Sequence, residues 1–267
     1  MYDFVDDSFN NENSHENILS IQVSLNGFSF CIQDTNNQRI LFFKHIDLKI
    51  SSPQLILRRF TEWINDEEAL RWSYRQKKLI YIGPQFTLLP QQFESEPVKH
   101  DLKKLLFTGN EEEFAENWIE EIHSKLFFSL PTGLNSTIQE QLGHVRIAHP
   151  ITPIIRAHFR HPAETSLVLF FDNTNMYLTL KQKGQLVIAN KFNVNHTNDA
   201  VYYALSVAKQ LKTDAKSCAV LLVGRSAYLK GLNEHLQQHF AELGWLPSEK
   251  SMANVEDREL SEFICLY

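Results

Sequence analysis

The stretch SLVLFFDNTNMYLTLKQKGQLVIANKFNVN, residues 166–195, decides the fold expected of this chain. An apolar run meets the polar corner DNTN, a second run follows, and the hairpin-like turn QKGQ leads into a third run. Short runs rich in apolar and aromatic residues, separated by polar turns, are typical of consecutive β-strands. The stretch therefore predicts an antiparallel meander of three strands.

The same order occurs near the N-terminus. From residue 19, LSIQVSLNGFSFCIQD alternates apolar and polar residues, and the turn-prone TNNQ separates it from RILFFKHIDLKI. This alternation predicts a second three-stranded meander. The two stretches share almost no sequence identity, so the similarity lies in the order of the elements.

A helical pattern and a further strand follow each meander. The first helix is expected over SPQLILRRFTEWINDEEAL, where Pro53 suits the first turn. The second is expected over TNDAVYYALSVAKQL, with Thr197 or Asn198 as the N-cap. The strands after them, KKLIYI and CAVLLV, end at Gly83 and Gly224. Element order repeated in this way predicts an internal duplication.

The first half carries additional elements. Helices are expected over PVKHDLKKLLF, EEEFAENWIEEI and STIQEQL, a strand over KLFFSLPTGL, and a helix over ITPIIRAHFRHP leading into the second half. We therefore expect three regions: an acidic, Asn-rich tail over 1–18 that is disordered or orders on a partner, a first lobe over 19–150, and a second lobe over 151–267. The apolar C-terminal ELSEFICLY is expected to add a final strand or to dock onto another chain.

Composition excludes several classes of protein. The net charge of −6 disfavours a general nucleic-acid binder, which needs a basic face. No apolar run approaches the roughly 18 residues of a membrane helix, so no membrane insertion is expected. The N-terminus lacks the basic and apolar regions of a signal peptide. The 3 cysteines are widely spaced, which predicts reduced thiols in a cytoplasmic protein.

A meander, helix, strand and helix used twice resembles the actin-like ATPase superfamily, which includes actin, sugar kinases, heat-shock chaperone ATPases and pilus-assembly proteins. The resemblance covers about residues 19–245 and is strongest to a bacterial domain family whose function is not established. It implies an α/β fold of the duplicated ribonuclease-H-like type, with two lobes, mixed sheets and helices on both faces. A cleft between the lobes is the expected nucleotide site.

In that superfamily the first corner of each meander is a phosphate loop of the form Asp-x-Gly, whose backbone N–H groups hold phosphate and whose Asp organises magnesium. Here the first corner is Ser-Leu-Asn-Gly, residues 24–27, and the Asp position is taken by Ser24 or, in a shifted alignment, by Asn26. The second corner keeps Asp172 but has Thr174 where glycine is expected. Each corner therefore lacks part of the phosphate loop.

A third motif, LLVGRSAYLKGL at residues 221–232, resembles the adenosine corner of the superfamily, usually Gly-Gly-x-Ser or Gly-Gly-Gly-Ala followed by Leu-x-Gly-Leu. Gly224 matches the first glycine, whereas Arg225 replaces the second and would crowd the base, reach solvent, or stack on the base. The nucleotide-binding residues implied by the resemblance are Asn26, Gly27, Asp172, Thr174, Gly224, Arg225 and Ser226.

Metal sites are not indicated. His235 and His239 are four residues apart on an expected helix, but the Glu of a zinc-protease helix is missing and no third ligand follows the pattern. These histidines are expected to lie on a solvated helix face.

Two functions are compatible with the sequence. The degenerate corners favour a non-enzymatic actin-like scaffold that binds another protein or forms a homodimer. The alternative is an ATP-binding protein with weak ATPase or phosphotransferase activity, in which Asp172 would hold magnesium and ATP would be the cofactor. In that alternative a second carboxylate is needed; Asp34 and Asp47 follow strands but lie outside the matching motif positions.

Overall fold

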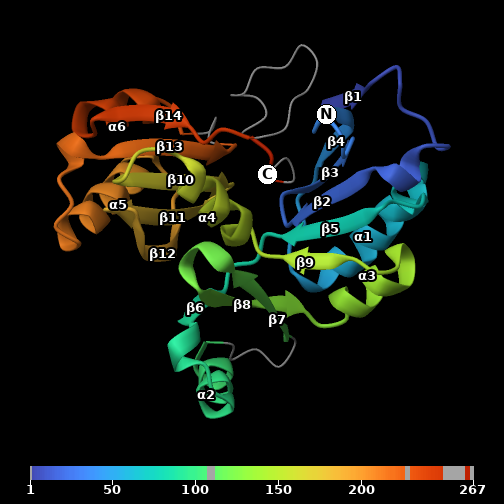
Figure 1. Ribbon diagram of the computed structural model, residues 1–267, viewed down its shortest axis with the longest axis horizontal. Coiled ribbons are helices and arrows are strands. Elements are labelled where there is room, and N and C mark those ends of the chain that lie inside the picture. The colour runs from blue at the N-terminus through green and yellow to red at the C-terminus, as the bar shows by residue number, and fades with distance from the viewer. Residues whose placement is uncertain (1, 107–111, 226–228, 249–261, 265–267) are drawn as a thin grey trace.

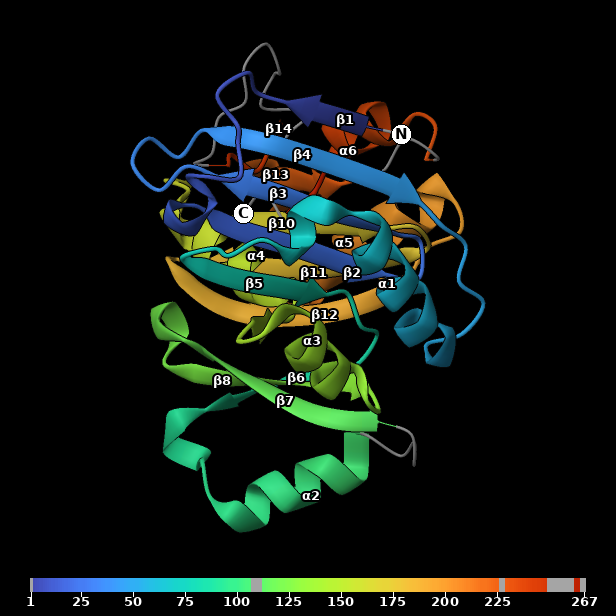
Figure 2. The same cartoon turned by 90° about the vertical axis from the view of Figure 1, so that its right-hand side faces the viewer.

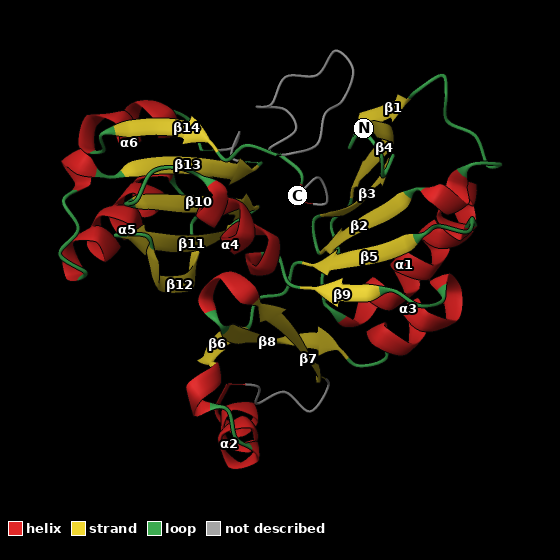
Figure 3. Ribbon diagram, in the orientation of Figure 1, coloured by secondary structure: helices red, strands yellow, loops and turns green. Residues whose placement is uncertain are grey.

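The protein forms two lobes that face each other, with a smaller sheet beneath them (Figure 1). This computed structural model describes residues 2–106, 112–225, 229–248 and 262–264. Each lobe is built on one mixed sheet, and helices cover the outer side of both sheets (Figure 3). The expected duplicated, two-lobed α/β architecture is confirmed.

The first sheet has the strand order β1-β4-β3-β2-β5-β9. Strands β2, β3 and β4 form the antiparallel meander predicted from the sequence, and β5 and β9 extend it in parallel. The strands are β1 (Tyr2–Val5), β2 (Ile18–Ser24), β3 (Gly27–Gln33), β4 (Ile40–Asp47), β5 (Gln76–Tyr81) and β9 (Arg146–Ala148).

The second sheet repeats this plan with the order β12-β11-β10-β13-β14. Its first three strands form an antiparallel meander, and β13 and β14 run parallel to β10. The strands are β10 (Ser166–Asp172), β11 (Asn175–Gln182), β12 (Gln185–Asn193), β13 (Ala219–Gly224) and β14 (Glu242–Trp245).

Six α-helices complete the described part of the chain. They are α1 (Gln54–Asp66), α2 (Glu96–Leu106), α3 (Leu134–Leu142), α4 (Ile151–Arg160), α5 (Thr197–Gln210) and α6 (Leu232–His239). The N-cap of α5 is His196, one residue before the predicted positions. Its backbone N–H donates to Asp199 Oδ2 at 2.9 Å, and its own side chain accepts from the N–H of Asp199 in a capping box.

The central strands of the second sheet are buried on both faces, which explains their continuous apolar runs. Along β10, Leu167, Leu169 and Phe171 pack with residues of α5 and α6. Val168 and Phe170 point the other way, into a core that also holds α4 and the first sheet. Because that core contains residues of both lobes, the lobes share packed apolar contacts.

The third sheet has the order β6-β8-β7 and comprises β6 (Phe86–Pro90), β8 (Ser124–Pro131) and β7 (Glu112–Ile119). The helix expected over EEEFAENWIEEI is wrong: most of it is strand β7, and only Glu120–Ile122 form a short 3-10 helix. Pairing with β8 along the whole of β7 outweighs the helix propensity of its glutamates. Figure 2 shows α2 standing at the far end of this sheet, away from both lobes.

The N-terminal residues lie on the first sheet. Strand β1 pairs antiparallel with β4, and Asp6 forms an ion pair of 2.6 Å with Arg39. The segment expected as a tail thus contains an edge strand. The lobe boundary at residue 150, between β9 and α4, stays a proposal, and the C-terminal strand prediction falls mostly outside the described residues. Within the described ranges, no helix has the length and apolarity needed to cross a bilayer.

Candidate functional site

The two predicted corners occupy equivalent positions in the two sheets. The β2–β3 turn is closed by the pair Ser24 and Gly27, and the β10–β11 turn by the pair Asp172 and Asn175. Both turns contain two residues, so Ser24 stands in the first lobe where Asp172 stands in the second. This geometry decides between the two alignments of the first corner in favour of Ser24.

The two corners contact each other through Asn26. Its Nδ2 donates to Asp172 Oδ2 at 3.0 Å, and its Oδ1 accepts from Nδ2 of Asn173 at 3.0 Å. The amide of one lobe therefore satisfies two polar side chains of the other. These are the corners that face phosphate in the actin-like resemblance, and here they are joined directly.

Asp172 lies in an environment that disfavours its charge. Burial raises the pKa of its carboxyl group to about 6, against the opposing effects of hydrogen bonds from Asn26 and Ser24 and of the Arg225 charge.

Arg225 spans the cleft from the end of β13. Its Nη1 donates to Asp47 Oδ1 at 2.5 Å and to His45 Nε2 at 2.9 Å, and both partners belong to β4 of the first lobe. The Arg225 hydrogen bond is the largest cause that lowers the pKa of Asp47. Arg225 therefore binds an anion of the protein itself.

His45 is the second residue of β4 that contacts Arg225. Its side chain is 4% exposed, and burial lowers its pKa, which favours the neutral ring. Nε2 lies 2.9 Å from Arg225 Nη1 and 3.1 Å from Asp47 Oδ1, and Nδ1 lies 2.8 Å from Ser29 Oγ. Three polar contacts therefore hold the imidazole in place.

Both corner glycines are required by backbone packing. Gly224 has a φ of 82°, and a Cβ there would lie 2.1 Å from the carbonyl oxygen of Phe171. A Cβ on Gly27 would lie 2.3 Å from the carbonyl oxygen of Ile46. No side chain fits at either distance, so the fold alone accounts for these glycines.

A pocket of about 720 Å³ remains beside the joined corners. Of the predicted residues, Asn26, Gly27, Asp172 and Arg225 line it. Thr174 is exposed and is not among the lining residues, nor is Gly224. Ser226 falls outside the described residues. The binding of a nucleotide by any of these residues stays a prediction.

Several lining residues were not among those predicted for the site: His45 and Asn173 were not singled out, and Asp47 was placed outside the motif positions. Asp47 ends β4 directly opposite Gly27, so its position after a strand was a usable signal once the register was known. Asn173 occupies the middle of the second corner with a φ of 51°, a conformation that asparagine adopts more readily than most residues. Among the described residues, no group of three His, Cys, Asp or Glu side chains could hold a metal ion.

A family model for "Protein of unknown function (DUF3822)" matches residues 6–243. The chain belongs to this family. The search of curated proteins returned no match.

Solved structures agree on the fold. The chain is similar to a Bacteroides thetaiotaomicron protein described as having an actin-like ATPase fold and unknown function, with a TM-score of 0.78, 21% identity, and coverage of 89% of this chain and 93% of that one. It is also similar to a chain of the PilM–PilN type IV pilus biogenesis complex, with a TM-score of 0.56, 11% identity, and coverage of 95% and 97%. The DUF3822 chain thus has the actin-like ATPase fold.

Proposed function

We propose that this DUF3822 protein is a non-enzymatic actin-like scaffold or protein-binding module. The observation that carries the proposal is Asn26, which bonds to Asp172 and Asn173 across the cleft. In an actin-like enzyme the two corners must present backbone N–H groups and a carboxylate to phosphate and magnesium. Here the carboxylate of the second corner, Asp172, is bonded to Asn26 of the first corner instead.

The polar groups of the cleft fit magnesium and nucleotide poorly. At the meeting corners Asp172 is the carboxylate, and its pKa is raised to about 6 because burial outweighs the hydrogen bonds from Asn26 and Ser24 and the charge of Arg225. Asp47, the second carboxylate lining the pocket that belongs to a strand, is paired with Arg225. Magnesium prefers several oxygen ligands, so binding it with these two carboxylates would require the contacts of Asp172 with Asn26 and of Asp47 with Arg225 to break.

A scaffold role needs a partner. The PilM–PilN complex shows that a chain of this general fold is found in a protein assembly. By analogy we propose that the partner of this chain is another protein or a second copy of itself.

One observation favours the alternative. The pocket of about 720 Å³ beside the corners lies within the size range of small-molecule sites. In this second candidate function ATP and magnesium would bind there, with Asp172 as a magnesium ligand, and weak ATPase or phosphotransferase activity would follow.

A measurement of phosphate release from Mg·ATP by the purified chain distinguishes the scaffold proposal from the ATP-binding alternative. The scaffold proposal expects no release above the buffer rate, and no difference between the wild type and Asp172→Ala. Release that depends on protein concentration and is lost in Asp172→Ala would overturn it. A release that persists in Asp172→Ala would indicate a contaminating enzyme, since the alternative assigns the metal to this side chain.

A further inference from the structure

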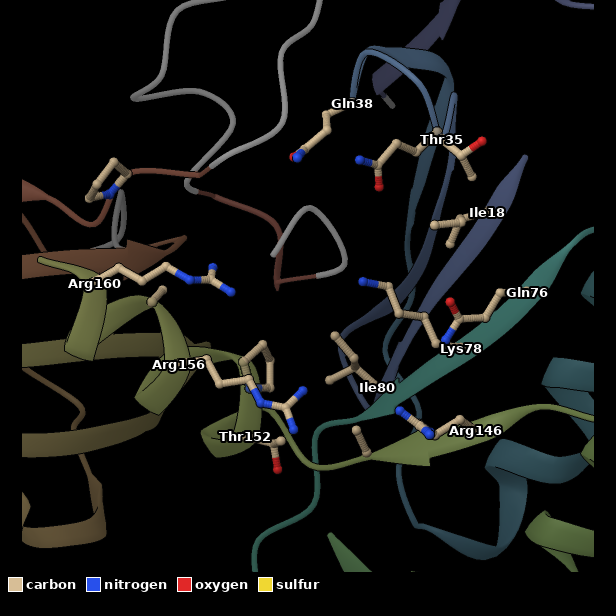
Figure 4. A pocket seen from close by; sticks show the side chains of 15 residues that line it. Ile18, Thr35, Gln38, Gln76, Lys78, Ile80, Arg146, Thr152, Arg156 and Arg160 are labelled. Carbon is tan, nitrogen blue, oxygen red and sulfur yellow. The ribbon is translucent and has the colours of Figure 1, made fainter. Parts of the chain in front are cut away.

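A second pocket, separate from the cleft corners, lies between the first sheet and helix α4 (Figure 4). It has a volume of about 390 Å³ and shares no lining residue with the pocket beside Asp172. We propose that it binds a small organic phosphate. The proposal does not depend on the function proposed for the cleft.

The pocket gathers positive charge in a chain whose net charge is −6. Its basic lining residues are Lys78, Arg146, Arg156 and Arg160, and no Asp or Glu is found among the described residues that line it. Figure 4 shows the nitrogen-bearing ends of these side chains turned toward the middle of the cavity, Lys78 and Arg146 from one side and the two α4 arginines from the other. Such a convergence creates a strongly positive local potential.

These charges are placed where they repel one another. Lys78 and Arg146 are direct neighbours on the parallel strands β5 and β9. Arg156 and Arg160 are four residues apart on α4 and therefore share one helix face. Like charges directly opposite in a sheet, or four apart on a helix, destabilise a fold. A bound anion would add attractive interactions that offset both repulsions.

Arg156 is held in position by the third sheet. Its Nη2 donates to the carbonyl oxygen of Trp118 at 3.2 Å, and its Nε lies 3.8 Å from Oε2 of Glu121. These two contacts restrain the guanidinium, so the side chain is partly pre-organised. A planar, positioned guanidinium suits the bidentate recognition of a phosphate group.

The rest of the lining argues for an organic group beside the phosphate. The pocket has apolar walls, formed by Ile18, Ile80, Ala148, Pro153 and Ala157. Amide and hydroxyl groups complete it, from Gln33, Gln38 and Thr152. Pockets that combine apolar walls with a few placed polar groups are typical of small-molecule sites. Inorganic phosphate alone would leave the apolar walls uncovered.

The test is isothermal calorimetry on the full chain with three probes: ribose 5-phosphate, inorganic pyrophosphate and uncharged ribose. Ribose 5-phosphate is expected to bind more tightly than pyrophosphate, and ribose is not expected to bind. Arg146→Gln and Arg156→Gln should each weaken ribose 5-phosphate binding by roughly tenfold to a hundredfold, the effect of losing a charge-assisted hydrogen bond. Arg58→Gln, on the exposed face of α1 with Glu62 at 3.6 Å, is the matched control and should bind as the wild type does.

The proposal would be overturned by no binding of ribose 5-phosphate, or by binding that is equal in the wild type, Arg146→Gln and Arg156→Gln. Equal loss in Arg58→Gln would also contradict it, because the effect would then be one of overall charge. Asp172→Asn should leave the affinity unchanged, and a loss there would place the ligand in the cleft instead. Thermal melting checks folding, and if a Gln variant is unfolded, Arg156→Lys and Arg146→Lys keep the charge and should still show weakened binding.

Discussion

Gly224 stands at a corner where a side chain would collide with the backbone of the neighbouring strand. The sequence indicated this corner from a glycine after an apolar strand, but could not say whether a ligand or the fold required it. The fold requires it: parallel pairing between β10 and β13 brings the carbonyl oxygen of Phe171 within 2.1 Å of where a Cβ on residue 224 would lie. Likewise, the contact between Arg225 and Asp47 depends on residues 178 positions apart, which no local pattern reports.

We expect Gly224→Ala to lower the free energy of unfolding by about 2–4 kcal/mol, because it adds both left-handed strain and overpacking. Gly184→Ala is the matched control: Gly184 has a φ of 76°, but a Cβ there would meet nothing within 4 Å. That variant should lose only about 1–2 kcal/mol, the strain alone. Urea denaturation measures both, and equal losses would contradict the packing argument.

Asp172 should make stability depend on pH. Its folded pKa, raised to about 6 by burial, exceeds the value of about 4 for an unfolded aspartate. Between these values the folded state binds more protons than the unfolded state, so stability falls as the pH rises from about 4 to 6 and is then constant. Asp172→Asn should remove this slope.

Above pH 6 the same variant should be more stable than the wild type, by about 1–3 kcal/mol, because an uncharged amide avoids the cost of burying a carboxylate. An asparagine oxygen can still accept the hydrogen bond from Asn26. Urea denaturation at a series of pH values measures the difference. A variant that is less stable than the wild type at pH 8 would show that the charge of Asp172 is stabilised by its surroundings.

At the scale of elements, the strands of the two meanders were predictable because their burial on the sheet leaves a strong apolar pattern. Strand β7 was not, because its glutamates favour a helix in isolation and only pairing with β8 makes it a strand. The contacts between elements were also beyond the sequence. Gly83, which follows β5, accepts hydrogen bonds at its carbonyl oxygen from Tyr177 Oη at 2.7 Å and from His149 Nε2 at 3.1 Å. Tyr177 belongs to β11, so this buried carbonyl joins the lobes.

Tyr177→Phe should therefore destabilise the protein by about 1–2 kcal/mol, the effect of removing one partner of a buried hydrogen bond. His149 would still donate to Gly83, because burial lowers its pKa to about 3 and keeps the ring neutral, and its Nδ1 accepts from the N–H of Ile151 at 3.3 Å, which leaves the hydrogen on Nε2. Tyr202→Phe is the control, because Tyr202 is 65% exposed. Chemical denaturation should detect a loss only in Tyr177→Phe, and similar values for the two variants would mean that this contact does not stabilise the lobe junction.

At the scale of the whole molecule, the duplication was readable from element order, and the actin-like fold followed from it. The state of the cleft was not readable, because it depends on the contacts of Asn26 with Asp172 and of Arg225 with Asp47, which form only after both lobes are folded and packed. The two lobes are joined at the corners, at Arg225 and at Gly83. We infer that the actin-like architecture is retained here as a rigid two-lobed body.

The most direct test of this inference is calorimetric titration of the wild-type chain with Mg·ATP. Joined corners predict no measurable binding up to millimolar nucleotide, with the same result for Asp172→Ala. Binding at micromolar strength that is lost in Asp172→Ala would contradict it, because the cleft contacts would then yield to a ligand that the account excludes.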